Sequence, residues 1–161
     1  MSPFKFIPLL ALLLVTACNR SPQDAADTQS LMNGSAAAYI AGNYVNAQRL
    51  AAEATRRDTQ FAEAWVGYGM ASVRLGQTTL ARATYQQALA LYQARHRQYP
   101  ALTTPVIQEI FLLTILNRPA DAEALLKQAH MEYPKDPTIT KFASDFAGME
   151  RGFNTLQVTV P

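Results

Sequence analysis

The chain has 161 residues, a length typical of one domain, and 49% of them are apolar. Its 14 basic and 12 acidic residues leave a formal net charge of +2, which is too small and too dispersed to predict a nucleic-acid partner. The one cysteine, Cys18, lies near the N-terminus. The rest of the sequence therefore encodes neither a disulfide nor a thiolate metal cluster.

The first residues have the pattern of a secretory signal. Lys5 supplies a positive charge, and the apolar segment 7–15 follows it. This segment is much shorter than the roughly 20 residues that a helix needs to span a bilayer. We therefore expect a targeting signal over residues 1–17 that is not part of the fold.

The apolar segment runs directly into Val15-Thr16-Ala17-Cys18. This tetrapeptide resembles a bacterial lipobox, with a branched apolar residue, two small residues and a cysteine. The resemblance implies cleavage before Cys18, acylation of that residue with palmitate-type chains, and anchoring by more than one acyl chain. Asn19 follows the cysteine. An aspartate at that position favours the inner membrane, so an asparagine there is compatible with the outer membrane. The alternative is an ordinary signal peptide, or an uncleaved anchor, with an incidental cysteine.

The mature chain begins with a short tether and a helix start within residues 18–27. Ser21 can cap a helix, Pro22 suits the first helical position, and Asp24 complements the helix dipole in the first turn. These residues predict a first helix from about 22 to 41.

Residues 62–93 have the pattern of a helix–turn–helix unit, carried by Trp65, Tyr68, Gly69, Gly76, Ala81, Tyr85 and Ala88. Four matching positions occur 34 residues earlier, at Leu31, Gly42, Ala47 and Ala54. The pattern resembles the tetratricopeptide (TPR) repeat family. The resemblance implies an all-α fold, a right-handed α-solenoid of about three units at 28–61, 62–95 and 103–136, with a C-terminal capping helix at 137–149. The alternative is a generic alanine-rich helical bundle.

The third unit starts at Thr103, 41 residues after Ala62 and thus seven later than the repeat requires. Seven residues are about two helical turns, so they extend the second helix of unit two without rotating its apolar face. We expect one long helix over 79–99, a break at Pro100 and a new helix started by Thr104-Pro105. The third unit departs from the family in its turn, Asn117-Arg118-Pro119, and in having Glu109 where leucine is usual. Its inward-facing residues are Val106, Ile110 and Leu113.

The last predicted helix begins at Asp136-Pro137 and ends near residue 149. Its apolar face, formed by Ile139, Phe142, Ala143 and Phe146, covers the end of the array. Residues 150–161 are expected to be a disordered tail. The alternation over 156–160 also fits an edge strand, but the sequence shows no partner strand.

Few residues suggest chemistry. His96 lies in a basic stretch on a helix expected to be exposed, and neither His96 nor His130 has a second histidine at metal-ligand spacing. Both are expected to be structural or solvated. Arg95 and Arg97 are expected on a solvated face, the alternative being contact with anionic lipid or with a partner's acids. We expect no cofactor, no metal and no enzymatic activity.

The resemblance implies that the first helix of each unit lines a concave surface. The positions that face a ligand in the family are here Gln29, Met32, Asn33, Ala36, Glu63, Val66, Met70, Val73, Arg74, Ile107, Gln108, Phe111 and Thr114. The carboxylate clamp of one subclass is not supported, because only Arg74 and Asn33 match it. We expect instead an apolar groove for an amphipathic helix or extended peptide, formed by Met32, Asn33, Val66, Met70, Val73, Arg74, Ile107 and Phe111. The alternative is that these residues pack as core.

These features predict a membrane-anchored TPR scaffold for protein–protein interaction in the bacterial cell envelope. The expected partner is another envelope protein, and the expected location is the periplasmic face of the outer membrane. By family analogy, such a scaffold assists assembly of a pilus, secretion or outer-membrane complex. The alternative function is an accessory regulator of a cell-wall enzyme.

Overall fold

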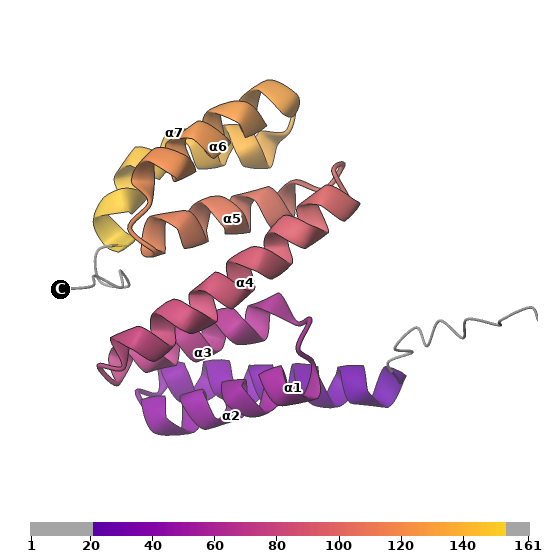
Figure 1. Ribbon diagram of the computed structural model, residues 1–161, viewed down its shortest axis with the longest axis vertical. Helices are drawn as coiled ribbons and strands as arrows, with labels where there is room; N and C mark the ends of the chain where they lie inside the picture. The colour runs from indigo at the N-terminus through magenta and orange to yellow at the C-terminus, as the bar shows by residue number, and fades with distance from the viewer. Residues whose placement is uncertain (1–20, 154–161) are drawn as a thin grey trace, which may run out of the picture.

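The computed structural model describes residues 21–153, with side chains described as far as Phe146. Over residues 21–153 the chain is all-α, with seven helices and no strand (Figure 1). The helices are α1 (Pro22–Ile40), α2 (Tyr44–Arg57), α3 (Ala62–Arg74), α4 (Thr78–Gln98), α5 (Thr103–Ile115), α6 (Pro119–Glu132) and α7 (Pro137–Phe153). In this part of the chain, every helix is too short or too polar to cross a membrane.

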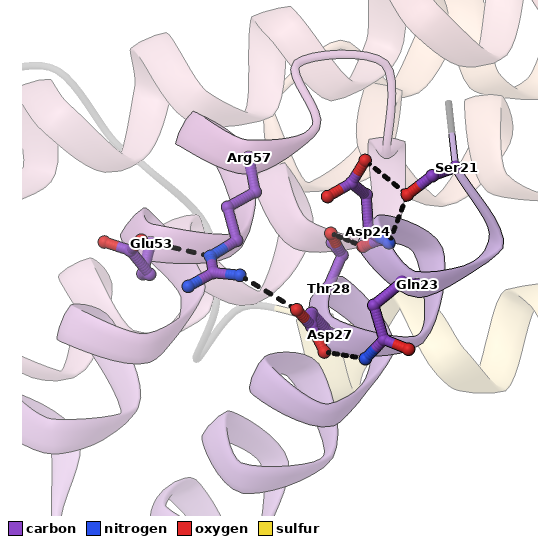
Figure 2. Close-up of polar contacts among 7 residues, drawn as sticks. All are labelled: Ser21, Gln23, Asp24, Asp27, Thr28, Glu53 and Arg57. Carbon is purple, nitrogen blue, oxygen red and sulfur yellow. Dashed lines mark hydrogen bonds and ion pairs between the residues drawn. The ribbon is translucent and has the colours of Figure 1, made fainter. Parts of the chain in front are cut away.

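Helix α1 begins where the sequence predicts. The Ser21 hydroxyl oxygen accepts a hydrogen bond from the Asp24 N–H at 3.1 Å, and Pro22 occupies the first turn. The Thr28 hydroxyl donates to the Asp24 carbonyl oxygen at 2.8 Å, within the same stretch of helix (Figure 2). The helix ends at Ile40, one residue before the predicted end.

The turns that follow α1, α3 and α5 share one geometry. Gly42, Gly76 and Asn117 take up left-handed conformations, with φ of 75°, 72° and 58°. In each turn the next residue's N–H closes the helix end: Asn43 to Ala38 O at 2.9 Å, Gln77 to Ser72 O at 2.9 Å, and Arg118 to Leu113 O at 2.8 Å. This is the Schellman arrangement, in which glycine is favoured and asparagine is tolerated. The unusual Asn117 turn therefore keeps the geometry of the two glycine turns.

Helix α4 is the longest, with 21 residues, and confirms the predicted two-turn extension. The start of α5 differs from the prediction, because the helix begins at Thr103 with Leu102 at its cap position and no side-chain cap. Pro105 lies in the first turn, where its missing N–H removes no intrahelical bond. The Thr103 hydroxyl donates instead to Asp136 Oδ2 at 3.2 Å, ahead of α7.

Each helix packs against the next along the chain, and α1 also contacts α3, as α5 contacts α7. Among the described residues no close backbone approach joins α3 to α5. Figure 1 shows α4 running obliquely between the layer of α1–α3 and the layer of α5–α7. The two additional turns of α4 carry the chain past α3 before α5 begins.

The core changes in character along the chain. Its N-terminal part contains fully buried alanines, among them Ala47, Ala51, Ala54, Ala64 and Ala71. Its C-terminal part contains large aliphatic residues, among them Val106, Ile110, Leu112, Leu113, Ile115 and Ile139. The predicted inward orientation of Val106, Ile110 and Leu113 is confirmed.

Helix α7 begins at Pro137, as predicted. The Asp136 Oδ1 atom accepts hydrogen bonds from the Ile139 N–H at 3.0 Å and the Thr138 N–H at 2.7 Å, and these bonds lower the pKa of Asp136. Ile139 and Phe146 are buried, as their predicted face requires. The helix continues to Phe153, four residues beyond the predicted end near 149.

The remaining predictions for the two ends of the chain lie outside the described residues. They concern the signal segment 1–17, Cys18 and the alternation over 156–160.

Candidate partner-binding site

A pocket of about 330 Å³ lies between α1 and α3. Its lining is almost entirely apolar and consists of Met32, Ser35, Ala36, Tyr39 and Ile40 from α1 and Glu63, Val66, Gly67 and Met70 from α3. Three of these, Met32, Val66 and Met70, belong to the predicted groove. Three of the predicted groove residues therefore lie around one apolar pocket, while their role in binding stays a prediction.

The pocket depends on a close approach at Gly67, which the sequence prediction missed. A β-carbon at this position would lie 2.9 Å from Met32 Cε and 3.9 Å from Ala51 Cβ. Only the flexible end of Met32 stands in its way, so Gly67 sets where that end lies. Glycine inside a helix costs about 1 kcal/mol relative to alanine, and its presence there was the available signal for close packing.

Aromatic and polar contacts hold the Ile40 end of the pocket. The rings of Tyr39 and Tyr44 meet edge to face with centroids 5.3 Å apart. Arg74 lies over the Tyr44 ring at 4.7 Å and donates to its hydroxyl at 2.7 Å. Burial raises the pKa of Tyr39, and the nearby Arg74 opposes that shift. Arg74, predicted to face a ligand, is therefore bound to α2 and does not line the pocket.

Ile40 lies at the edge of the pocket and is 85% exposed. Close by, the buried Ser35 hydroxyl donates to the Ala47 carbonyl oxygen at 2.8 Å, which fixes α1 against α2. The apolar lining thus continues onto an open surface supported by a fixed helix pair.

Glu63 is the charged residue of the pocket lining. Arg95 Nη1 lies 3.1 Å from Glu63 Oε1, in a partly exposed ion pair that contributes little to stability. Burial raises the pKa of Tyr92, and the neighbouring Glu63 carboxylate raises it further. Arg95, expected on a solvated face, remains partly exposed and also joins α4 to α3, because α4 passes across the start of α3.

The other predicted groove residues lie elsewhere. Asn33 is exposed and accepts a hydrogen bond from Gln29 at 3.1 Å. Val73 and Phe111 are partly buried against the main core. Ile107 lines a second cavity, of about 490 Å³, between α5 and α7. In the part of the chain that the structure describes, α3 and α5 make no close backbone approach, and Ile107 and Phe111 do not line the α1–α3 pocket.

His96 has the structural one of its two expected roles, although its stretch of helix was expected to be exposed. Its Nδ1 lies 2.9 Å from Glu109 Oε1, and the Glu109 side chain is 7% exposed. Burial raises the pKa of Glu109, while His96 and then Arg97 oppose the shift. The pair joins the end of α4 to α5, which gives the buried Glu109 carboxylate a polar partner. His96 and Glu109 line neither of the two cavities described above.

His130 is exposed on α6. Within the part of the chain that the structure describes, histidines and acids do not form a group of three or more that could hold a metal ion.

Comparison of the chain with known protein families, with curated proteins and with solved structures finds no match.

Proposed function

We propose that this protein is a membrane-anchored scaffold of the bacterial cell envelope that holds another envelope protein in its α1–α3 pocket. The observation that carries the proposal is an apolar pocket of about 330 Å³ whose edge continues onto the exposed Ile40. Pockets of this size take a bulky side chain or a small ligand. The proposed occupant is an apolar side chain of an amphipathic helix or an extended peptide.

The exposure of Ile40 favours a peptide over a small molecule. A small ligand gains most of its burial inside the pocket, so it would leave an 85% exposed isoleucine uncovered at the edge. An amphipathic helix presents apolar side chains one turn apart along one face. One such side chain can fill the pocket while the next covers Ile40. Met32 and Met70 suit such a surface, since their flexible thioethers adapt to different anchors.

A solenoid of three TPR-like units is our proposal for the architecture. It is supported by three helix pairs, α1–α2, α3–α4 and α5–α6, whose internal turns share one hydrogen-bonding pattern. Gly42 and Gly76 are 34 residues apart, whereas Asn117 follows Gly76 by 41. The difference of seven residues is taken up by α4.

A first experiment tests the pocket in cells that contain the native partner. Ala36 and Ala37 are adjacent, exposed α1 residues, but only Ala36 lines the pocket. After chemical cross-linking, Ala36→Glu is expected to lose the partner that the unmodified chain captures, because its carboxylate would be desolvated by the bound side chain. The control Ala37→Glu is expected to retain it. Equal capture by both variants, each with native helical content, would refute the pocket as the partner site.

A second experiment tests the anchor. We propose that Cys18 is acylated and holds the chain at the periplasmic face of the outer membrane. Cys18→Ser is expected to release the protein from membranes or to stall its processing. Unchanged membrane association would contradict the lipid anchor and leave the pocket proposal untouched.

A further inference from the structure

The turn between α4 and α5 presents apolar side chains to solvent. Tyr99 is 50% exposed and Leu102 is 52% exposed. Arg97, in the last turn of α4, is also exposed. Protein surfaces that bind at a membrane interface are rich in residues of these types, namely tyrosine, leucine and arginine. Tyrosine suits the interface because its ring is apolar and its hydroxyl is polar.

This turn lies on the same side of the molecule as the start of α1, but it is well separated from it along the vertical long axis of Figure 1. In Figure 1, α1 begins at the right, and α4 rises to the α4–α5 turn at the right as well. Ser21 lies three positions after Cys18, and three extended residue steps span at most about 11 Å. A lipid on Cys18 would therefore keep the start of α1 close to the bilayer, and a bilayer lying along this side of the molecule would also meet the α4–α5 turn.

Polar contacts hold the start of α1 on its neighbour. Arg57 at the end of α2 lies 3.3 Å from Asp27 of α1 and 3.3 Å from Glu53 of its own helix (Figure 2). This half-exposed ion pair contributes little to stability, but it joins the second turn of α1 to the end of α2.

The α4–α5 turn is also braced. The Tyr133 hydroxyl donates to the Pro100 carbonyl oxygen, and the Leu102 N–H donates to the Tyr99 carbonyl oxygen at 3.0 Å. The exposed side chains of Tyr99 and Leu102 are thus presented from a turn that is tied to the end of α6.

We propose that the α4–α5 turn rests on the phospholipid bilayer, with Tyr99 and Leu102 in its interfacial region and Arg97 facing anionic headgroups. This inference depends on the proposed lipid anchor, which supplies the proximity that two half-exposed side chains do not supply alone. It gives the anchored protein a fixed orientation. The α1–α2 turn, with Ile40 and Val45, then points away from the membrane, so the Ile40 edge of the pocket is open to a partner.

The test uses the lipidated full-length chain in vesicles of phosphatidylethanolamine and phosphatidylglycerol. Cys18 is the chain's only cysteine and is blocked by lipid in this state, so an introduced cysteine can carry a single spin label. The labelled sites are Leu102→Cys and, as a control at the opposite end, Val45→Cys, where the native residue is 67% exposed. We expect the ratio of oxygen to aqueous nickel accessibility to be several-fold higher at position 102 than at position 45.

The outcomes separate this inference from the anchor on which it depends. Equal, water-like accessibility at both positions in a chain that floats with the vesicles overturns the inference and leaves the anchor standing. A lipid-like ratio of oxygen to nickel accessibility at both positions 102 and 45 also overturns the inference, because it contradicts the proposed orientation. A processed chain that fails to float refutes the anchor and the inference together. As a second variant, Tyr99→Ser in the Leu102→Cys chain is expected to shift the label at 102 toward water.

Discussion

Between α1 and α4 the helices meet largely through alanine and glycine, whereas between α5 and α7 they meet through isoleucine, leucine and valine. In the first region, a β-carbon on Gly69 would lie only 2.4 Å from Tyr85 Cε1. In the second, Ile110, Leu112 and Ile115 are completely buried. The two regions are therefore sensitive to opposite changes: the first to added atoms and the second to removed ones.

This difference also bears on where the pocket lies. Small residues let α1, α2 and α3 approach closely, and at Gly67 the missing β-carbon leaves room for the end of Met32. The backbone around the pocket is therefore closely packed, while the Met32 and Met70 side chains that line it are flexible. The α5–α7 cavity is lined by Ile107 of α5 and by α7 residues such as Phe142, with no glycine among the described residues that line it.

The largest expected effect is the loss of an aliphatic side chain from the second region. Ile110 is fully buried, so Ile110→Ala is expected to lower the free energy of unfolding by about 2–5 kcal/mol, from lost burial and the cavity left behind. Urea unfolding measures this change. Ile107→Ala, three residues earlier and only partly buried, serves as the control and should cost clearly less. Equal costs at the two positions would contradict the assignment of the core.

The matching test of the first region adds one methyl group. Gly69→Ala is expected to destabilise the chain by about 1–3 kcal/mol, because the buried Tyr85 ring cannot move aside. At Gly34 the added carbon would meet only Leu50 Cδ1, at 3.3 Å. Gly34→Ala is therefore expected to be neutral or to stabilise α1 by up to about 1 kcal/mol. Similar unfolding free energies for the two variants would show that the helices approach less closely than described.

The junction between the two regions is expected to respond to pH through Glu109. Burial raises the pKa of Glu109 in the folded chain. The stability linked to its protonated form is present below the unfolded pKa and is lost as pH rises through the folded pKa. Glu109→Gln does not titrate there. Urea unfolding from about pH 4 to pH 7 should therefore show the unmodified chain losing stability relative to Glu109→Gln. A pH-independent difference would mean that His96 fully offsets the cost of burial.

The smallest expected effect on stability is at the pocket. Gly67→Ala gains up to about 1 kcal/mol of helix propensity and displaces only the end of Met32. The chain should keep its unfolding midpoint within a few degrees, while the displaced methionine changes the pocket and weakens partner capture. Gly34→Ala is again the control, since Gly34 does not line the pocket. Undiminished capture by Gly67→Ala would argue that Met32 has no contact with the partner.

The helices and turns were predictable because their signals are local. Ser21 and Pro22 mark the start of α1, Gly42 and Gly76 mark two helix ends, and the seven additional residues set the length of α4. The way in which the long α4 changes the helix packing was not predictable by aligning one repeat unit on the next. Such an alignment assumes that each first helix lies beside the next, and the extension of α4 removes that contact between α3 and α5.

The side-chain partners were less predictable than the backbone. His96 and Arg95 lie in a basic run that reads as solvated, yet each meets an acid from another helix, Glu109 and Glu63 respectively. Such pairs depend on where two helices cross, and a single sequence does not encode the crossing in any local pattern. Gly67 differs, because a glycine within a helix is a local signal of close packing, but its neighbour Met32 lies 35 residues away in the chain and was not identifiable.

The proposal that a partner docks in the α1–α3 pocket is tested most directly by a photoreactive amino acid placed at position 36 or 37 of the chain in its native cell. Both residues are exposed on α1, but only Ala36 lines the pocket. We predict one strong adduct to a single envelope protein from position 36 and little or none from position 37. Adducts of equal yield from both positions, or none from position 36 in a correctly folded, membrane-associated chain, would contradict the proposal.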